Sequence, residues 1–190
     1  MVTLTELWQP ILLSGVLVWI VSAIIWMVMP HHKSDFKALP DVDAARKALT
    51  PQNLTPGVYT IPHMESPEAA KQPENEKLFN EGPVGFLTIV PQGVPPMGGK
   101  IFQPFIFFVV VSILVAYVVG RTLAPGADYL TVFRVAGTTA WLAYGWGIIP
   151  SAIWFGKPWS HVIKDMIDAL VYALLTAGTF GWLFPRLIAS

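Results

Sequence analysis

Five side chains in this sequence have the chemistry of metal ligands and lie at the ends of apolar runs. They are His31, His32, His161, Asp165 and Asp168. Imidazole nitrogens and carboxylate oxygens are ligands that first-row transition metals take in proteins. His31 and His32 close one apolar run and His161 opens another, so antiparallel membrane helices would bring all five to one membrane face.

The spacing of these residues does not by itself define a metal site. His31 and His32 are adjacent, and adjacent side chains on a helix point apart. A histidine at the end of a membrane helix commonly contacts water or lipid headgroups, and its ordinary pKa of about 6.5 suits an anionic lipid surface. We therefore predict that His31 and His32 are interface residues and that no metal or other cofactor is bound. A metal site in this candidate polar cluster is the alternative.

Asp168 is the most informative member of the cluster, because it lies about two turns inside the last apolar segment. A carboxylate within a membrane helix is costly and by default suggests a functional site. The competing interpretation is an ion pair with Lys164, one turn back on the same face, or with Lys157 or Lys33. The sequence favours the ion pair, since Asp168 is still within reach of the interface.

Motifs that would indicate catalysis are missing from the sequence. There is no cysteine, which excludes disulfides, thiolate ligands and cysteine nucleophiles. A Ser-His-Asp order, an HExxH helix, a Walker loop and a helix-opening GxGxxG are absent as well. Because the formal net charge is zero, no nucleic-acid partner is expected. We assign no catalytic residue and expect no enzymatic activity.

Four apolar segments must position these side chains. Only 13% of the residues are charged, against about 25% in soluble domains. Charges are sparse in residues 8–29, 104–123, 129–149 and 162–184. A helix of about 20 apolar residues crosses a hydrocarbon core about 30 Å thick. The sequence thus predicts an all-α membrane protein, a four-helix transmembrane bundle whose last three helices are antiparallel neighbours.

One long polar segment interrupts the bundle. The expected domains are a transmembrane helix at 1–29, an extramembrane lid at 30–103 and transmembrane helices 2 to 4 at 104–190. The lid contains 11 of the 17 prolines and eight of the 12 acidic residues, so it is too polar for lipid. Asp41 and Ser66 are typical caps of two short helices, and 58–61 and 84–90 are typical of strands. We expect a small α+β lid that rests on the bundle or on a partner.

Small residues recur every three or four positions in the last two apolar segments. They are Ala136, Ala140, Ala143 and Gly147 in one, and Ala169, Ala173, Ala177 and Gly181 in the other. Small residues let membrane helices approach closely. We predict that these two helices pack on each other, with a surface for another subunit as the alternative.

The distribution of Lys and Arg predicts the orientation. Seven of these residues lie near one membrane face (Lys33, Lys37, Arg46, Lys47, Lys100, Lys157 and Lys164), and three lie near the other (Arg121, Arg134 and Arg186). Under the positive-inside rule this favours a cytoplasmic lid and external termini. Arg134 is expected to contact Asp128, a lipid phosphate or a partner.

The runs "MPHHKSDF", "LPD" and "DALVYALLTAGTFGWLFPR" together resemble a group of small bacterial membrane proteins that has no assigned function. The likeness covers most of the chain. It implies four spans and a lid, and no activity, cofactor or partner.

Two functional hypotheses follow from the sequence. The first is a non-enzymatic accessory or assembly subunit of a larger bacterial inner-membrane complex, of respiratory or photosynthetic type. Its partners would be the lipid bilayer and other membrane subunits, or further copies of itself. The alternative is a small membrane transporter or metal-dependent membrane enzyme, with a site at the junction of lid and bundle that uses Asp168, His161, His31 and His32.

Overall fold

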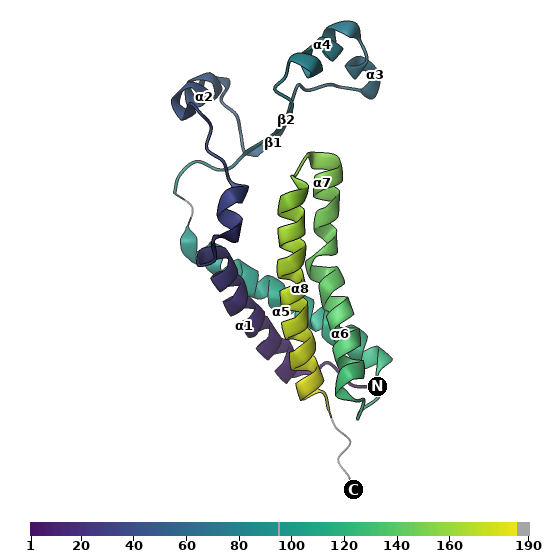
Figure 1. Cartoon of the computed structure of the whole chain (residues 1–190). Coiled ribbons are helices and arrows are strands. Elements are labelled where there is room, and N and C mark those ends of the chain that lie inside the picture. Colours follow the sequence, from purple (N-terminus) through teal and green to yellow (C-terminus); the bar gives the residue numbers. More distant parts are fainter. Residues whose placement is uncertain (95, 186–190) are drawn as a thin grey trace. The chain divides into compact units, whose positions relative to one another are not determined.

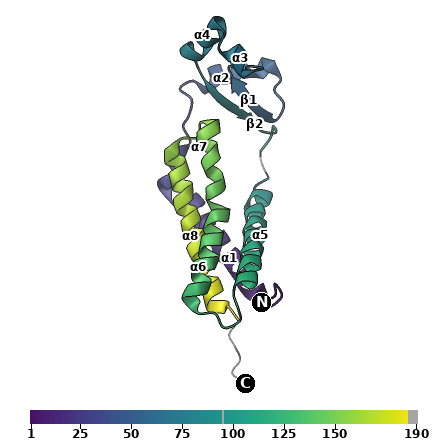
Figure 2. The ribbon, with the colours of Figure 1, turned by 90° about the vertical axis from the view of Figure 1, so that its right-hand side faces the viewer.

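The chain forms two compact units in the computed structural model, which describes residues 1–94 and 96–185. The helical unit contains Met1–Asp35, Pro96–Pro150 and the chain from Pro158 onward. The small unit contains the segment between the first two of these stretches, together with Ser151–Lys157. Figure 1 and Figure 2 show the ribbon from two sides.

The helical unit carries the long apolar helices. Its elements are α1 (Trp8–Met27), η1 (Pro30–Asp35), α5 (Met97–Thr122), α6 (Tyr129–Tyr144), η3 (Trp146–Ile148) and α8 (Trp159–Leu183). Among the described residues, α1, α5 and α8 are long and apolar enough to cross a membrane. The chain is therefore a multi-pass membrane protein, mostly helical as predicted.

The third predicted span, 129–149, is divided in the structure. α6 has 16 residues, about 24 Å at about 1.5 Å per residue, and η3 and α7 (Ile149–Phe155) follow it. The division falls at Gly145, where an added Cβ would lie 2.9 Å from the Cβ of Ala169. Glycine permits the close approach to α8 but weakens the helix. The predicted count of four spans is not confirmed.

α5 begins at Met97, seven residues before the predicted start at 104. Gly98 and Gly99, which follow Met97, lie within the helix. Pro104 is also inside α5. Because proline has no N–H, the carbonyl of Lys100 does not receive the usual helical hydrogen bond from residue 104.

α6 and α8 run alongside each other, and α1 and α5 cross them obliquely (Figures 1 and 2). α8 packs against α6 and α1, and α5 packs against α1 and α6. The backbone N–H of Val2 donates to the carbonyl of Gly120 at 3.0 Å, which brings the start of the chain to the end of α5. Val115, Val119 and Val132 are fully buried between the helices. Burial of these side chains, with close helix contacts, stabilises the unit.

The predicted small-residue stripe is an inner face on α8 and only partly one on α6. Ala136, Ala140, Ala169, Ala173 and Ala177 are buried, Gly181 is half-buried, and Ala143 and Gly147 are exposed. On α6 the close contact shifts to Gly137, whose added Cβ would lie 3.1 Å from the Cβ of Ala177. At Gly181 an added Cβ would lie 2.7 Å from the ring of Tyr129. α6 and α8 therefore approach each other closely at several small residues.

The small unit contains the predicted short helices and strands. They are α2 (Val42–Leu49), η2 (Thr50–Gln52), β1 (Gly57–Ile61), α3 (Pro67–Ala70), α4 (Pro73–Glu81) and β2 (Gly85–Ile89). Asp41 and Ser66 accept hydrogen bonds from the first turns of α2 and α3, as predicted. β1 and β2 are antiparallel, with Gly57 opposite Ile89. None of the described residues in this unit is fully buried, which fits a segment too small for a large core.

Candidate polar site between η1 and α8

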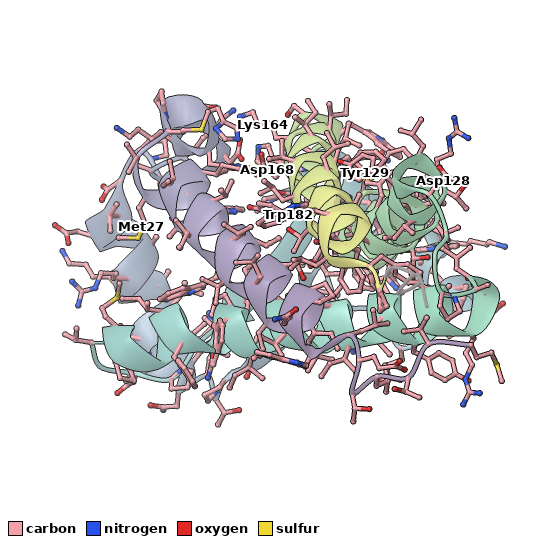
Figure 3. The ribbon with its side chains drawn as sticks, turned by 90° about the horizontal axis from the view of Figure 1, so that it is seen from below. Met27, Asp128, Tyr129, Lys164, Asp168 and Trp182 are labelled. Atoms are coloured by element: carbon pink, nitrogen blue, oxygen red, sulfur yellow. The ribbon has the colours of Figure 1, made fainter. Side chains whose placement is uncertain are left out.

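The candidate polar cluster forms where η1 lies against the first turns of α8. α1 ends at Met27, and Pro30 opens the 3₁₀ helix that carries His31, His32 and Asp35. Contacts between η1 and α8 bring these side chains to Lys164 and Asp168. Figure 3 shows Lys164 and Asp168 on the side of α8 toward α1.

The Asp168 carboxylate lies within hydrogen-bond distance of both histidines. The Nε2 atom of His31 lies 3.2 Å from its Oδ1, and the Nε2 atom of His32 lies 2.7 Å from its Oδ2. The ligand atoms of these three residues all lie within 4.8 Å of one another. His32 and Asp168 are 4% and 5% exposed, so their contact is shielded from water. The adjacent histidines thus converge, whereas the sequence predicted that they point apart.

His32 lies between two carboxylates. Its Nδ1 atom is 2.7 Å from Asp35 Oδ2, opposite the Asp168 contact, and its ring stacks on Trp26 with centroids 3.9 Å apart. Burial disfavours the charged imidazole, but hydrogen bonds to Asp168 and Asp35 outweigh it and raise the pKa of His32 above its ordinary value. Both ring nitrogens thus face carboxylate oxygens, an arrangement that favours the doubly protonated imidazole when no other cation is bound.

Asp35 joins the cluster to the start of α8. Its Oδ1 atom accepts a hydrogen bond from Lys164 Nζ at 2.5 Å and lies 3.6 Å from His161 Nε2. Hydrogen bonds from Lys164 and then from His32 lower the pKa of Asp35 to about 2. Lys164 also donates to the carbonyl of His31 and to Ser34 Oγ. One lysine therefore ties three residues of η1 to α8.

Part of the predicted cluster comes together in the structure, but the partners of Asp168 and Lys164 differ from the predicted ones. His31, His32 and Asp168 contact one another directly. His161 contacts Asp35, which in turn contacts His32. Asp165 is half-buried and does not belong to the group of close ligand atoms. Asp168 bonds the two histidines, and Lys164, its expected partner, bonds Asp35 instead. The i,i+4 rule favoured the local lysine, but the tertiary contact with η1 provides closer partners.

Asp35 is the residue of the polar cluster that the sequence analysis missed. The available signal was its spacing of three residues from His32, which places both side chains on one face of a single turn. This spacing was overlooked because residues 30–103 were assigned as a whole to a polar lid.

Arg134 lies apart from this cluster and is exposed on α6. Asp128, one of its expected partners, accepts hydrogen bonds from the backbone N–H and the hydroxyl of Thr131. These bonds lower the pKa of Asp128 and cap α6. A contact between Arg134 and a lipid phosphate or a partner stays a prediction.

The arrangement around His32 is the one that metal-binding histidines use. Such a histidine binds the metal through one nitrogen and donates its other N–H to a carboxylate that fixes the ring. Asp35 takes that second position at Nδ1, which leaves Nε2 for a cation between His32, His31 and Asp168. The side chain of His31 is 30% exposed, which gives an ion a route from solvent.

Together, the apolar helices and this cluster define a multi-pass membrane protein with a buried ionisable site at one end of its helical unit. No protein-family model, no curated protein and no solved structure matches this chain. The function is therefore argued from the site itself.

Proposed function

We propose that this chain is a multi-pass membrane protein that binds one divalent transition-metal ion, of the zinc type, through His31, His32 and Asp168. The observation that carries the proposal is the convergence of two imidazoles and one carboxylate, with one imidazole oriented from behind by Asp35. Three protein ligands leave a fourth position for water or another ligand.

The charges of the cluster favour a cation. Asp35 and Asp168 supply two negative charges, and Lys164 neutralises one of them through Asp35. The remaining charge is balanced by the second proton on His32 when no metal is bound. A divalent ion binds at Nε2 of His32 by displacing that proton, since a metal ligand must offer a free lone pair.

A structural clamp is the competing function for the same contacts. In that case no metal displaces the proton on Nε2 of His32, and the cluster serves only to hold η1 against α8. A buried ion pair does not by itself indicate a large gain in stability, so metal content rather than stability must decide between the two.

The test is metal binding by the full chain, purified in detergent without a histidine tag and stripped with a chelator. After equilibration with Zn²⁺ and desalting, elemental analysis is expected to give about one zinc per chain, as a single three-ligand site requires. The His31→Ala/His32→Ala double variant and Asp168→Asn are expected to lose the zinc. His63→Ala, a histidine of the small unit that bonds Thr60, is the matched control and keeps it. Equal zinc in the double variant and the control would overturn the proposal.

We also retain the proposal that the chain serves as an accessory or assembly subunit of a larger complex in the bacterial inner membrane, with four spans. Its support is the many exposed apolar side chains of the long helices and the short link between α5 and α6. Extraction in mild detergent followed by affinity purification tests it. A stoichiometric partner subunit is expected, and a chain that purifies alone with its zinc would favour an independent metal-binding protein.

A further inference from the structure

Lys164 contacts the part of η1 that carries the two histidines of the proposed metal site. Its Nζ atom donates to the backbone carbonyl of His31 at 2.5 Å and to Oδ1 of Asp35 at 2.5 Å. A third hydrogen bond, 2.9 Å long, goes to Oγ of Ser34. An ammonium group has three N–H donors, so these acceptors use its full capacity. The lysine is thus attached to η1 at three points.

The hydrogen bond from Lys164 to Asp35 acts on the ring of His32. One carboxylate oxygen of Asp35 accepts from Lys164, and the other lies 2.7 Å from Nδ1 of His32. Because the lysine holds the first oxygen, the second stays directed at the ring nitrogen that does not bind the metal. Outer partners that orient a metal-binding histidine in this way are typically worth about 10- to 100-fold in metal affinity.

The hydrogen bond from Lys164 to the carbonyl of His31 acts on the backbone between the two histidines. This carbonyl belongs to the peptide unit that joins His31 to His32, so its position affects both side chains. Asp168, the third ligand, lies four residues after Lys164 on the same face of α8 (Figure 3). One face of α8 therefore supplies one ligand and also the group that holds the other two.

We propose that Lys164 is a positioning residue that sets the affinity of the metal site, by holding Asp35 and the peptide between the two histidines in the geometry that the ion requires. This inference rests on the proposed function and deepens it. The charge of the lysine has the opposite effect, because a cation close to the site repels a divalent ion. Removal of Lys164 therefore shows whether positioning or charge repulsion dominates.

The experiment measures the zinc affinity of the full chain in detergent, without a histidine tag, by competition with a chromogenic chelator. Lys164→Met keeps a side chain of similar length but has no charge and no donor, and it is expected to bind zinc about 10-fold more weakly. Lys164→Arg keeps a cation with N–H donors and is expected to recover most of the affinity. Lys77→Met is the matched control, because Lys77 is exposed on α4 and pairs only with Glu81 at 3.5 Å. It is expected to bind zinc like the parent chain.

Co²⁺ in place of zinc separates positioning from a merely structural role. Co²⁺ with four ligands absorbs visible light more strongly than Co²⁺ with five or six. At saturating Co²⁺, the absorption of Lys164→Met is expected to be weaker than that of the parent chain, because water replaces a histidine that is no longer held in place. A lysine that only holds η1 against α8 would leave the spectrum of the loaded protein unchanged, which would overturn the inference.

Thermal unfolding without metal shows whether Lys164→Met is folded. If it is not, Lys164→Gln, which keeps one amide donor, is measured in its place, and weaker zinc binding is again expected. Zinc binding as tight as that of the parent chain, or tighter, would overturn the inference and leave the proposed metal site standing. A parent chain that binds no zinc would instead remove the proposed function on which the inference rests.

Discussion

The Nε2 atom of His32 lies 2.7 Å from Oδ2 of Asp168, and both side chains are almost completely buried. This contact joins η1 to α8 across 136 positions of the sequence. It is the interaction on which both the metal site and its protein-only alternative depend.

Asp168→Asn is expected to destabilise the metal-free protein by about 3 kcal/mol, because it leaves the buried charge of His32 with one carboxylate fewer. Thermal unfolding in detergent with a chelator present measures the change. Asp43→Asn, on the exposed surface of α2, is the control and should unfold like the parent chain. If the two variants unfold alike, the contact does not hold η1 on α8.

The pH dependence of the metal-free protein follows from His32 and Asp35. The pKa of His32 is raised in the folded state, so its stabilisation is present below its unfolded pKa of about 6.5 and is lost as the pH rises through the folded value. The pKa of Asp35 is lowered to about 2, so its stabilisation is present above about pH 4 and is lost as the pH falls toward 2.

Thermal unfolding is therefore expected at the highest temperature between about pH 4 and pH 6.5. A series of unfolding scans with a chelator present checks this. His32→Gln should flatten the fall on the alkaline side while leaving the fall on the acidic side. A parent chain whose stability does not change between pH 6 and pH 9 would contradict the prediction.

The helices were predictable where one local signal dominates. The long apolar runs identified α1 and α8, and the cap residues Asp41 and Ser66 identified α2 and α3. The partners of Asp168 were not predictable, because they depend on a tertiary contact with η1. The helical rule for adjacent histidines also failed, since His31 and His32 lie in a separate 3₁₀ segment rather than on α1.

The close packing of α6 on α8 predicts a contrast between inner and outer positions of α8. Ala173 and Ala177 are buried against neighbouring helices, whereas Leu174 is 49% exposed. Ala173→Leu or Ala177→Leu is expected to cost about 1–3 kcal/mol through overpacking, and Leu174→Ala much less. Ala143→Leu, at an exposed position of α6, is the matched control for an added side chain. Equal melting temperatures of all four variants in detergent would exclude a tight α6–α8 contact.

The orientation predicted from Lys and Arg can be tested in this cysteine-free chain. A cysteine at Gln72, an exposed position of the small unit, should resist an impermeant thiol reagent in intact cells and react after the cells are opened. A cysteine at Ala124, exposed in the turn between α5 and α6, should react in intact cells. The reverse pattern would place the small unit outside.

The number of spans is the last prediction, and it depends on whether α6 crosses the membrane. α6 has only 16 residues, but η3 and α7 continue the helical path as far as Phe155. A cysteine at Trp154, which is 74% exposed, reports the side on which this path ends. With four spans, α5 and α6 are successive crossings, so Trp154→Cys should be labelled from the same side as Gln72→Cys. Labelling of Trp154→Cys from the side of Ala124→Cys would contradict both the four crossings and the contact between η1 and the first turns of α8.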